Sequence, residues 1–125
     1  MEKQSRSGPA RLIDATRYSI QGLAGAWRNE TAFRQEVVSI ALAMPVAFWL
    51  GETAAQRALL ILSVLLILIV ELINSAIEAT VDRIGAERHP LSAQAKNMGS
   101  AAVLIALINA FSVWALVAWE RWMGR

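Results

Sequence analysis

A long apolar segment that carries carboxylates on one face is the feature that most constrains how this chain can fold. Residues 58–70 contain one serine and no other side chain able to form a hydrogen bond. At ~100° per residue in a helix, Glu71, Glu78 and Asp82 fall within about 40° of one another. Asn74 lies about 60° to one side of Glu71. The sequence therefore predicts a polar stripe along one apolar helix.

The depth of this stripe limits what can surround it. At ~1.5 Å per residue, Glu71 lies about 20 Å along the helix from residue 58, inside a hydrocarbon core ~30 Å thick. Asp82 lies near the far interface. An ionised carboxylate at the depth of Glu71 is strongly destabilising unless a partner, a metal ion or a proton neutralises it. We therefore expect the stripe to face protein or a ligand rather than lipid.

Composition places the chain among integral membrane proteins. Its 125 residues are 56% hydrophobic with a mean hydropathy of +0.43, more than a soluble core of that size can bury. There is no cysteine, which excludes disulfide and thiolate chemistry. The net charge is +2, but the basic residues flank apolar segments instead of forming a patch with aromatic residues. Nucleic acid is therefore not an expected partner.

Three apolar segments predict three membrane spans. Residues 58–81 and 98–119 are each long enough to cross a bilayer as a helix. The apolar part of the first segment, 37–50, is short and contains Pro45, so it could also be re-entrant. It spans when extended back to Thr31, as 31–50, which requires Arg34 to snorkel and leaves Glu36 near the headgroups or against protein. The predicted class is a single all-α membrane domain.

Basic residues predict the orientation of these spans. Nine of them lie before or within the start of the first span or between the second and third, and three lie on the other side. This asymmetry favours a cytoplasmic N-terminus and a periplasmic C-terminus. The first group is Lys3, Arg6, Arg11, Arg17, Arg28, Arg34, Arg83, Arg88 and Lys96, and the second is Arg57, Arg121 and Arg125.

A separate helix is predicted before the first span, over residues 9–29. Ser7 and Pro9 are typical of a helix start, and apolar residues recur at helical spacing opposite basic and polar ones. This pattern is typical of an amphipathic helix that lies on the membrane surface. Gly22 and Gly25 weaken the helix, and they would let a lipid or another helix approach closely. A surface anchor without chemistry is the alternative interpretation.

The polar residues point to phosphoryl chemistry without a standard nucleotide fold. The sequence has no P-loop and no kinase glycine-rich loop. Oxygen ligands such as Glu78 suit Mg²⁺, which binds through one or two carboxylates plus substrate phosphates. The expected loop at 82–89, followed by Lys96, supplies cationic groups for a polyphosphate. The buried position of Glu71 is suited to a general base acting on a membrane-borne acceptor.

The same residues carry a family resemblance. The run at 71–82, ELINSAIEATVD, is similar to the signature of the prokaryotic diacylglycerol kinases, which are small integral membrane enzymes. The resemblance covers nearly the whole chain. Further matches are Tyr18 and Ser19, Ala26 and Trp27, Asn29 and Glu30, AFRQE at 32–36, Trp49 and Leu50, DRIG at 82–85, Ala95 and Lys96, and MGSAA at 98–102.

The resemblance implies a homotrimer of three-span subunits in the bacterial inner membrane. It implies transfer of the γ-phosphoryl group of MgATP to the hydroxyl of diacylglycerol, with Glu71 as the base and Glu30 and Glu78 as metal ligands. The residues implied to bind or support the nucleotide are Arg11, Tyr18, Glu30, Asn74, Glu78, Asp82, Glu87, Arg88, His89, Lys96 and Asn97. Those implied for the lipid are Arg11, Ser19, Trp27, Arg34, Glu36, Trp49, Arg57, Ser100 and Trp114.

Asn97 and His89 limit which functional roles can be inferred from the resemblance. The family usually has Asp where this chain has Asn97, which can hydrogen-bond but brings no charge. Either this position only shapes its surroundings, or the protein is impaired. His89 precedes Pro90, which restricts the backbone of the histidine.

The sequence also permits other interpretations of these residues. Asn74 and Ser75 alone could form a structural hydrogen-bond seam, His89 could be a solvated loop residue, and Lys96 could be a topology charge. An undecaprenol kinase would use the same chemistry, and a small cation or proton channel would use the acidic stripe differently. Close helix packing is the simplest interpretation of Ala41, Ala43, Ala47, Gly99, Ala101 and Ala102.

Overall fold

The computed structural model describes residues 7–124, and all of its regular elements are helices. This confirms the predicted all-α class. The helices are α1 (Gly8–Asn29), α2 (Thr31–Leu50), α3 (Ala54–Ile84) and α4 (Pro90–Met123). The basic residues Lys3, Arg6 and Arg125, which contributed to the predicted orientation, lie outside the described residues.

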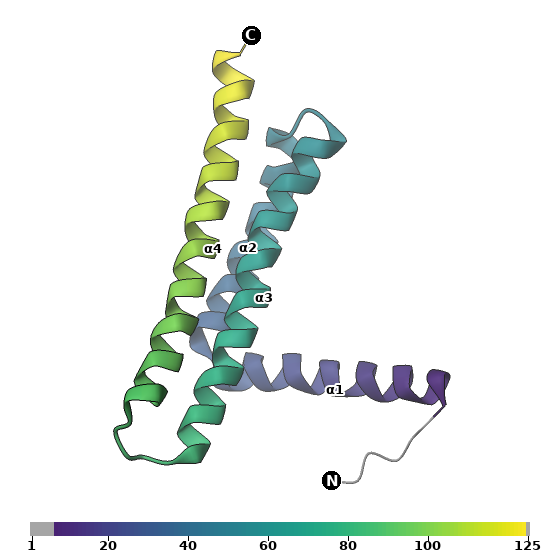
Figure 1. Cartoon of the computed structure of the whole chain (residues 1–125). Coiled ribbons are helices and arrows are strands. Elements are labelled where there is room, and N and C mark those ends of the chain that lie inside the picture. Colours follow the sequence, from purple (N-terminus) through teal and green to yellow (C-terminus); the bar gives the residue numbers. More distant parts are fainter. Residues whose placement is uncertain (1–6, 125) are drawn as a thin grey trace.

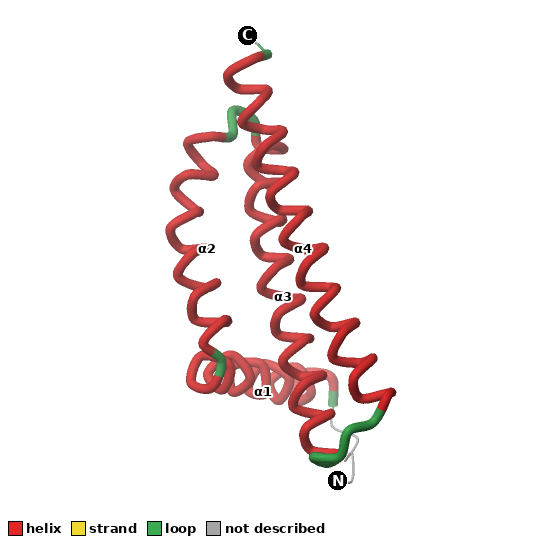
Figure 2. The backbone as a smooth tube through the Cα atoms, turned by 90° about the vertical axis from the view of Figure 1, so that its left-hand side faces the viewer, coloured by secondary structure: helices red, strands yellow, loops and turns green. Residues whose placement is uncertain are grey.

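Helices α2, α3 and α4 run alongside one another, whereas α1 crosses one end of this bundle (Figures 1 and 2). We call the end with α1 and the α3–α4 connection the α1 end. The α2–α3 connection and the C-terminus lie at the opposite end, which we call the far end (Figure 1). Helices α3 and α4 share the most extensive contact, and α2 packs mainly on α3.

Helices α2, α3 and α4 are each long and apolar enough to cross a membrane. Helix α3 has 31 residues and α4 has 34. They are therefore about 46 and 51 Å long, which exceeds the ~30 Å of a hydrocarbon core. Both helices extend beyond the apolar segments 58–81 and 98–119. Hydropathy locates the lipid-facing part of a helix, whereas hydrogen bonding of the backbone decides where the helix ends.

The length of α3 corrects the loop expected at residues 82–89. Helix α3 continues through Asp82 to Ile84, so the connection begins only at Gly85. At its other end, α3 is capped by Thr53, whose side chain accepts a hydrogen bond from the Gln56 amide at 3.1 Å. Asp82 is therefore held on a rigid helix rather than on a flexible loop.

Helix α1 begins as its sequence predicts, with one difference. Pro9 lies in the first turn, where its missing N–H costs nothing. Ser7 occupies the N-cap position, but its side chain makes no capping hydrogen bond. Leu12, Ile13 and Ile20 are all exposed, because only part of this helix touches the bundle. These side chains form an exposed apolar face on α1.

The apolar core lies toward the far end. Its buried residues are Ala47, Leu50, Leu60 and Val117, from α2, α3 and α4. Trp114 packs against this cluster, and its indole Nε1 donates a hydrogen bond to the Ser63 hydroxyl at 3.2 Å. The Ser63 hydroxyl in turn donates to the Leu60 carbonyl at 2.8 Å. The buried serine is therefore satisfied and joins α3 to α4.

Two arginines hold the far end together by capping the end of α2. Arg57 Nε donates to the carbonyls of Phe48 and Gly51, at 3.1 and 3.0 Å. Arg121 Nη1 donates to the Trp49 carbonyl at 2.9 Å, and its guanidinium lies 4.7 Å from the centroid of the Trp49 ring. These contacts satisfy carbonyls that have no partner within the helix. They tie α2 to both α3 and α4.

We expect Arg121→Gln to lower the midpoint of thermal unfolding in detergent by about 4–8 °C, since it removes a charged capping group worth about 1 kcal/mol. Arg17→Gln, an exposed position on α1, serves as the control and should leave the midpoint unchanged. Equal midpoints for the two variants would contradict a capping role for Arg121.

Candidate active site

Four carboxylates from α3, α2 and the α1–α2 junction converge at the α1 end. Glu71 and Glu78 project from α3 and are half-buried, and Glu36 projects from α2. Glu30 is the residue between α1 and α2 and serves as the N-cap residue of α2 with an extended backbone. The charges of Glu78 and Glu30 act on Glu71, and that of Glu71 acts on Glu36. Glu71 thus faces α2 and the α1–α2 junction, whereas Asn74 and Asp82 of the predicted stripe contact α4.

Asn74 contacts one member of this cluster, Glu78. It is buried between α3 and α4, with 8% of its surface exposed. Its amide Nδ2 donates to Glu78 Oε1 at 3.3 Å, one helical turn further along α3. Its Oδ1 is buried without a hydrogen-bond partner, as is Oε2 of Glu36. Such unpaired acceptors are costly and mark positions where a polar partner is missing.

The acid cluster suits a metal ion that is completed by its substrate. Among residues 7–124, no three His, Asp or Glu side chains are close enough to hold a metal ion unaided. Mg²⁺ does not require such a cage, because it retains water molecules and binds one or two carboxylates plus phosphate oxygens. Glu30 and Glu78 both provide hard oxygen ligands. Glu30 precedes Glu71 in the sequence, and Glu78 follows it. The donor set therefore fits Mg²⁺ held together with a polyphosphate.

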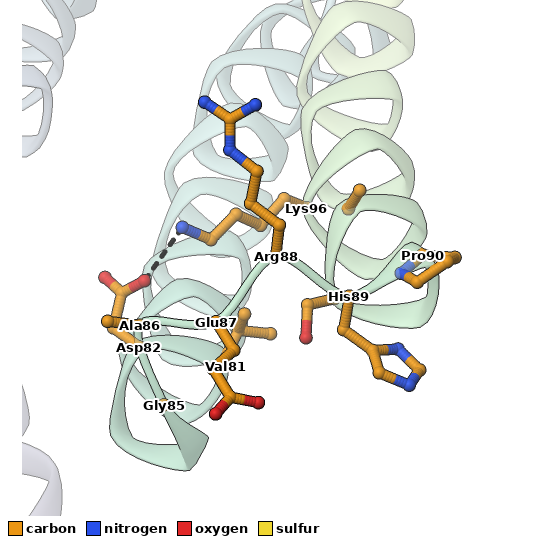
Figure 3. Close-up of a pocket in the computed structure, with 11 residues that line it drawn as sticks. Val81, Asp82, Gly85, Ala86, Glu87, Arg88, His89, Pro90 and Lys96 are labelled. Atoms are coloured by element: carbon orange, nitrogen blue, oxygen red, sulfur yellow. Dashed lines mark hydrogen bonds and ion pairs between the residues drawn. The ribbon is translucent and has the colours of Figure 1, made fainter.

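An ion pair links α3 to α4 next to the acid cluster. Lys96 Nζ donates to Asp82 Oδ1 at 2.8 Å (Figure 3). Both side chains are substantially exposed, so the pair contributes little to stability. Its effect is to direct the lysine ammonium group toward the acidic end of α3.

A cavity of about 620 Å³ lies at the α3–α4 connection. This volume is within the range of small-molecule sites. Figure 3 shows the side chains of Arg88 and Lys96 on one side of the connection, with Glu87 and His89 directed away from them. The cavity is lined by Val81, Asp82, Gly85, Ala86, Glu87, Arg88, His89, Pro90, Ser92, Ala93 and Lys96. It brings together five of the residues predicted for the nucleotide.

His89 has a defined structural role within this cavity. It is the N-cap residue of α4, and its Nδ1 accepts a hydrogen bond from the Leu91 amide at 3.1 Å. An accepting Nδ1 leaves the proton of the neutral ring on Nε2. Its backbone is extended, as expected before Pro90. His89 is therefore more than a solvated loop residue, and its Nε2 remains free to donate.

A second cavity, of about 520 Å³, lies between α1 and α3. Its walls are mainly apolar and include Gly22 and Gly25 of α1 and Ser75 of α3, together with Glu30. A Cβ added to either glycine would meet nothing within 4 Å, so this face of α1 is open. The two glycines predict a close approach, but no sequence pattern indicates the α3 wall. That wall consists of Leu72, Ser75 and Ala76, which lie beside the acidic stripe on α3 but carry no charge.

The residues predicted for the lipid do not lie together. Ser19 lines the α1–α3 cavity, and Arg34 lies at the α1 end, where its guanidinium donates to the carbonyls of Trp27 and Arg28 at 2.8 and 3.2 Å. Ser100 is exposed on α4, and Trp114 is about 21 Å further along that helix.

Trp49 and Arg57 belong to the far end with Trp114, where all three have packing or capping partners. Arg11 and Tyr18 are exposed on α1, and Arg11 lies about 27 Å along α1 from its junction with α2. Because α1 leads away from the α3–α4 connection, a single chain does not bring Arg11 to that cavity (Figure 1). Asn97 is exposed on α4, next to Lys96.

Comparison with known proteins identifies the family of this chain. Residues 17–118 match the family model described as prokaryotic diacylglycerol kinase. The chain is 56% identical to a diacylglycerol kinase of Escherichia coli K12 over 115 residues, covering 92% of this chain and 94% of that protein. It is 52% identical to one from Haemophilus influenzae over 108 residues, covering 86% and 92%. It is 51% identical to one from Pseudomonas aeruginosa over 114 residues, covering 91% and 93%.

The family match covers most of the chain, including every carboxylate of the acid cluster, and the named relatives align over nearly their full length. The chain therefore belongs to the prokaryotic diacylglycerol kinase family.

Proposed function

We propose that this chain transfers the γ-phosphoryl group of MgATP to the free hydroxyl of diacylglycerol, giving phosphatidic acid and ADP. The observation that carries the proposal is the position of Glu71. It lies among carboxylates and next in the sequence to Leu72, which lines the apolar cavity between α1 and α3. The cavity at the α3–α4 connection, which contains Arg88 and Lys96, begins at Val81, about 15 Å further along α3. A lipid would therefore approach Glu71 from the first cavity, and a nucleotide at the second would extend its triphosphate along α3 toward it.

Glu71 is the proposed base. The lipid hydroxyl oxygen attacks the γ-phosphorus, the bond from that phosphorus to the bridging oxygen of ADP breaks, and the hydroxyl proton passes to the Glu71 carboxylate. Glu30 and Glu78 would hold Mg²⁺, which neutralises phosphate charge when bound. Such a transfer depends mainly on positioning and charge neutralisation, which side chains on rigid helices supply.

Arg88 and Lys96 are the proposed cationic contacts of the triphosphate. The Asp82 carboxylate holds the Lys96 ammonium on the side of α4 that faces α3. The Nε2 of His89 is a neutral donor for the nucleotide, because its Nδ1 is occupied by the helix cap. The apolar α1–α3 cavity is the proposed entry for the lipid, with Ser19 near its polar edge.

The proposed orientation follows from the same geometry. ATP is cytoplasmic, so the α1 end would face the cytoplasm, in agreement with the excess of basic residues there.

We also propose self-association as a homotrimer. Arg11 lies far from the cavity at the α3–α4 connection of its own chain, so it would reach such a cavity only in a neighbouring copy. An undecaprenol kinase or a cation channel has no observation in its favour, since the named relatives are all diacylglycerol kinases.

We expect Glu71→Gln to lower kcat with MgATP and dioleoylglycerol by about 10²–10⁴-fold, because a general base is lost. Glu78→Gln should lower activity and raise the Mg²⁺ concentration needed for half-maximal velocity. Glu52→Gln, at the far end, should leave both values unchanged, and size-exclusion chromatography should show the same oligomer throughout. Retention of more than a third of the activity in Glu71→Gln would refute its role as base.

Two variants separate the capping role of His89 from nucleotide binding. His89→Asn retains an acceptor near the position of Nδ1, whereas His89→Gln retains an N–H near the position of Nε2. We expect His89→Asn to keep the thermal midpoint but to raise the KM for ATP about 3–10-fold, since one neutral hydrogen bond is lost. His89→Gln should lower the midpoint and keep the KM. An unchanged KM in His89→Asn would leave the residue as a helix cap alone.

The exposed position of Asn97 allows a direct test of the departure from the family. In liposomes with MgATP and dioleoylglycerol, the natural chain should be active, and Asn97→Asp should change kcat/KM by no more than about threefold, as for an exposed charge. A gain of two orders of magnitude would instead show that Asn97 impairs this protein. Inactivity of both proteins on dioleoylglycerol and on undecaprenol would refute the lipid kinase.

A further inference from the structure

Gly99 of α4 lies where the side chain of Asn74 of α3 packs directly against the backbone of α4. It is buried, and a Cβ added to it would overlap Asn74 Oδ1 and lie 3.2 Å from Asn74 Cγ. The three atoms nearest to this Cβ all belong to Asn74. Glycine inside a helix is about 1 kcal/mol less favourable than alanine. The missing side chain of Gly99 leaves a space that the Asn74 side chain fills.

That side chain is oriented by the space at Gly99. The Asn74 amide has its oxygen toward Gly99, buried and without a hydrogen-bond partner. Its nitrogen is directed to Glu78 Oε1 at 3.3 Å. A methyl group at residue 99 would push the amide out of this position, and the hydrogen bond to Glu78 would be lost or lengthened.

We propose that Gly99 is a positioning residue of the phosphoryl-transfer site, acting through Asn74 on the carboxylate of Glu78. The proposal rests on the function proposed above, in which Glu78 holds Mg²⁺. By fixing one oxygen of Glu78, the Asn74 amide leaves the other in a constant direction for the ion. Groups that orient a metal ligand typically change metal affinity 10–100-fold when they are removed.

The α3–α4 interface offers a matched control. Ala110 is buried on α4, eleven residues and therefore about 16 Å or three turns beyond Gly99, on the same face of the helix. Ala110→Val adds volume to the same interface at a distance from the acid cluster. It tests whether overpacking alone changes the properties of the site.

The experiment measures Mn²⁺ binding by electron paramagnetic resonance, in the presence of a non-hydrolysable ATP analogue, together with the velocity as a function of free Mg²⁺. We expect Gly99→Ala to weaken Mn²⁺ binding about tenfold and to raise the half-saturating Mg²⁺ concentration similarly. Ala110→Val should change neither, even where it lowers the thermal midpoint as much. Equal metal binding in the two variants would overturn the proposal.

A double-variant cycle tests the route through Asn74. In an Asn74→Ala background the overlap is absent, so adding Gly99→Ala should change Mn²⁺ binding less than twofold. A further loss of about tenfold, or failure of the double variant to fold, would show that Gly99 acts on something else. Should Gly99→Ala alone fail to fold, the double variant carries the test. Mn²⁺ binding is measured without lipid turnover, so an inactive natural chain would refute the proposed function and still leave the role of Gly99 measurable.

Discussion

The cost of placing ionised carboxylates near hydrocarbon is the constraint on which the structure depends. Glu71 lies deep enough to require partners, whereas α3 and α4 continue past the apolar core and carry Asp82 and Lys96 out of it. Helix α1 and the start of α2 cover this end and add Glu30. The charges are therefore held at the mouth of the bundle, where water, a metal ion and phosphate can reach them.

The bundle separates stability from chemistry along its length. The far end contains the apolar cluster around Leu60, the buried hydrogen bond between Ser63 and Trp114, and the arginines that cap α2. Among residues 7–124, the α1 end has fewer buried apolar side chains, and it contains the buried oxygens of Glu36 and Asn74 that have no hydrogen-bond partner. Unpaired acceptors destabilise a fold, and they are tolerated here because the far end supplies the packing.

Sequence reasoning predicted the helical class and the shared face of Glu71 and Glu78, since both follow from hydropathy and the 3.6-residue period. It placed Asp82 in a loop because hydropathy falls there, although the backbone stays helical to Ile84. It could not show that Trp114 and Trp49 pack at the far end. The local sequence around a tryptophan does not show which end of the bundle it occupies. Its position depends on how the whole chain folds.

By itself the sequence determined that this is a three-span helical protein with an acidic stripe, because burial cost and helical periodicity are local properties. Tertiary structure decided which groups meet that stripe. The pairing of Lys96 with Asp82, the two cavities and the approach of Gly99 to Asn74 depend on how α1 and α4 pack against α3. Contacts between distant segments are set by packing and by the satisfaction of buried polar groups, which no single stretch of sequence contains.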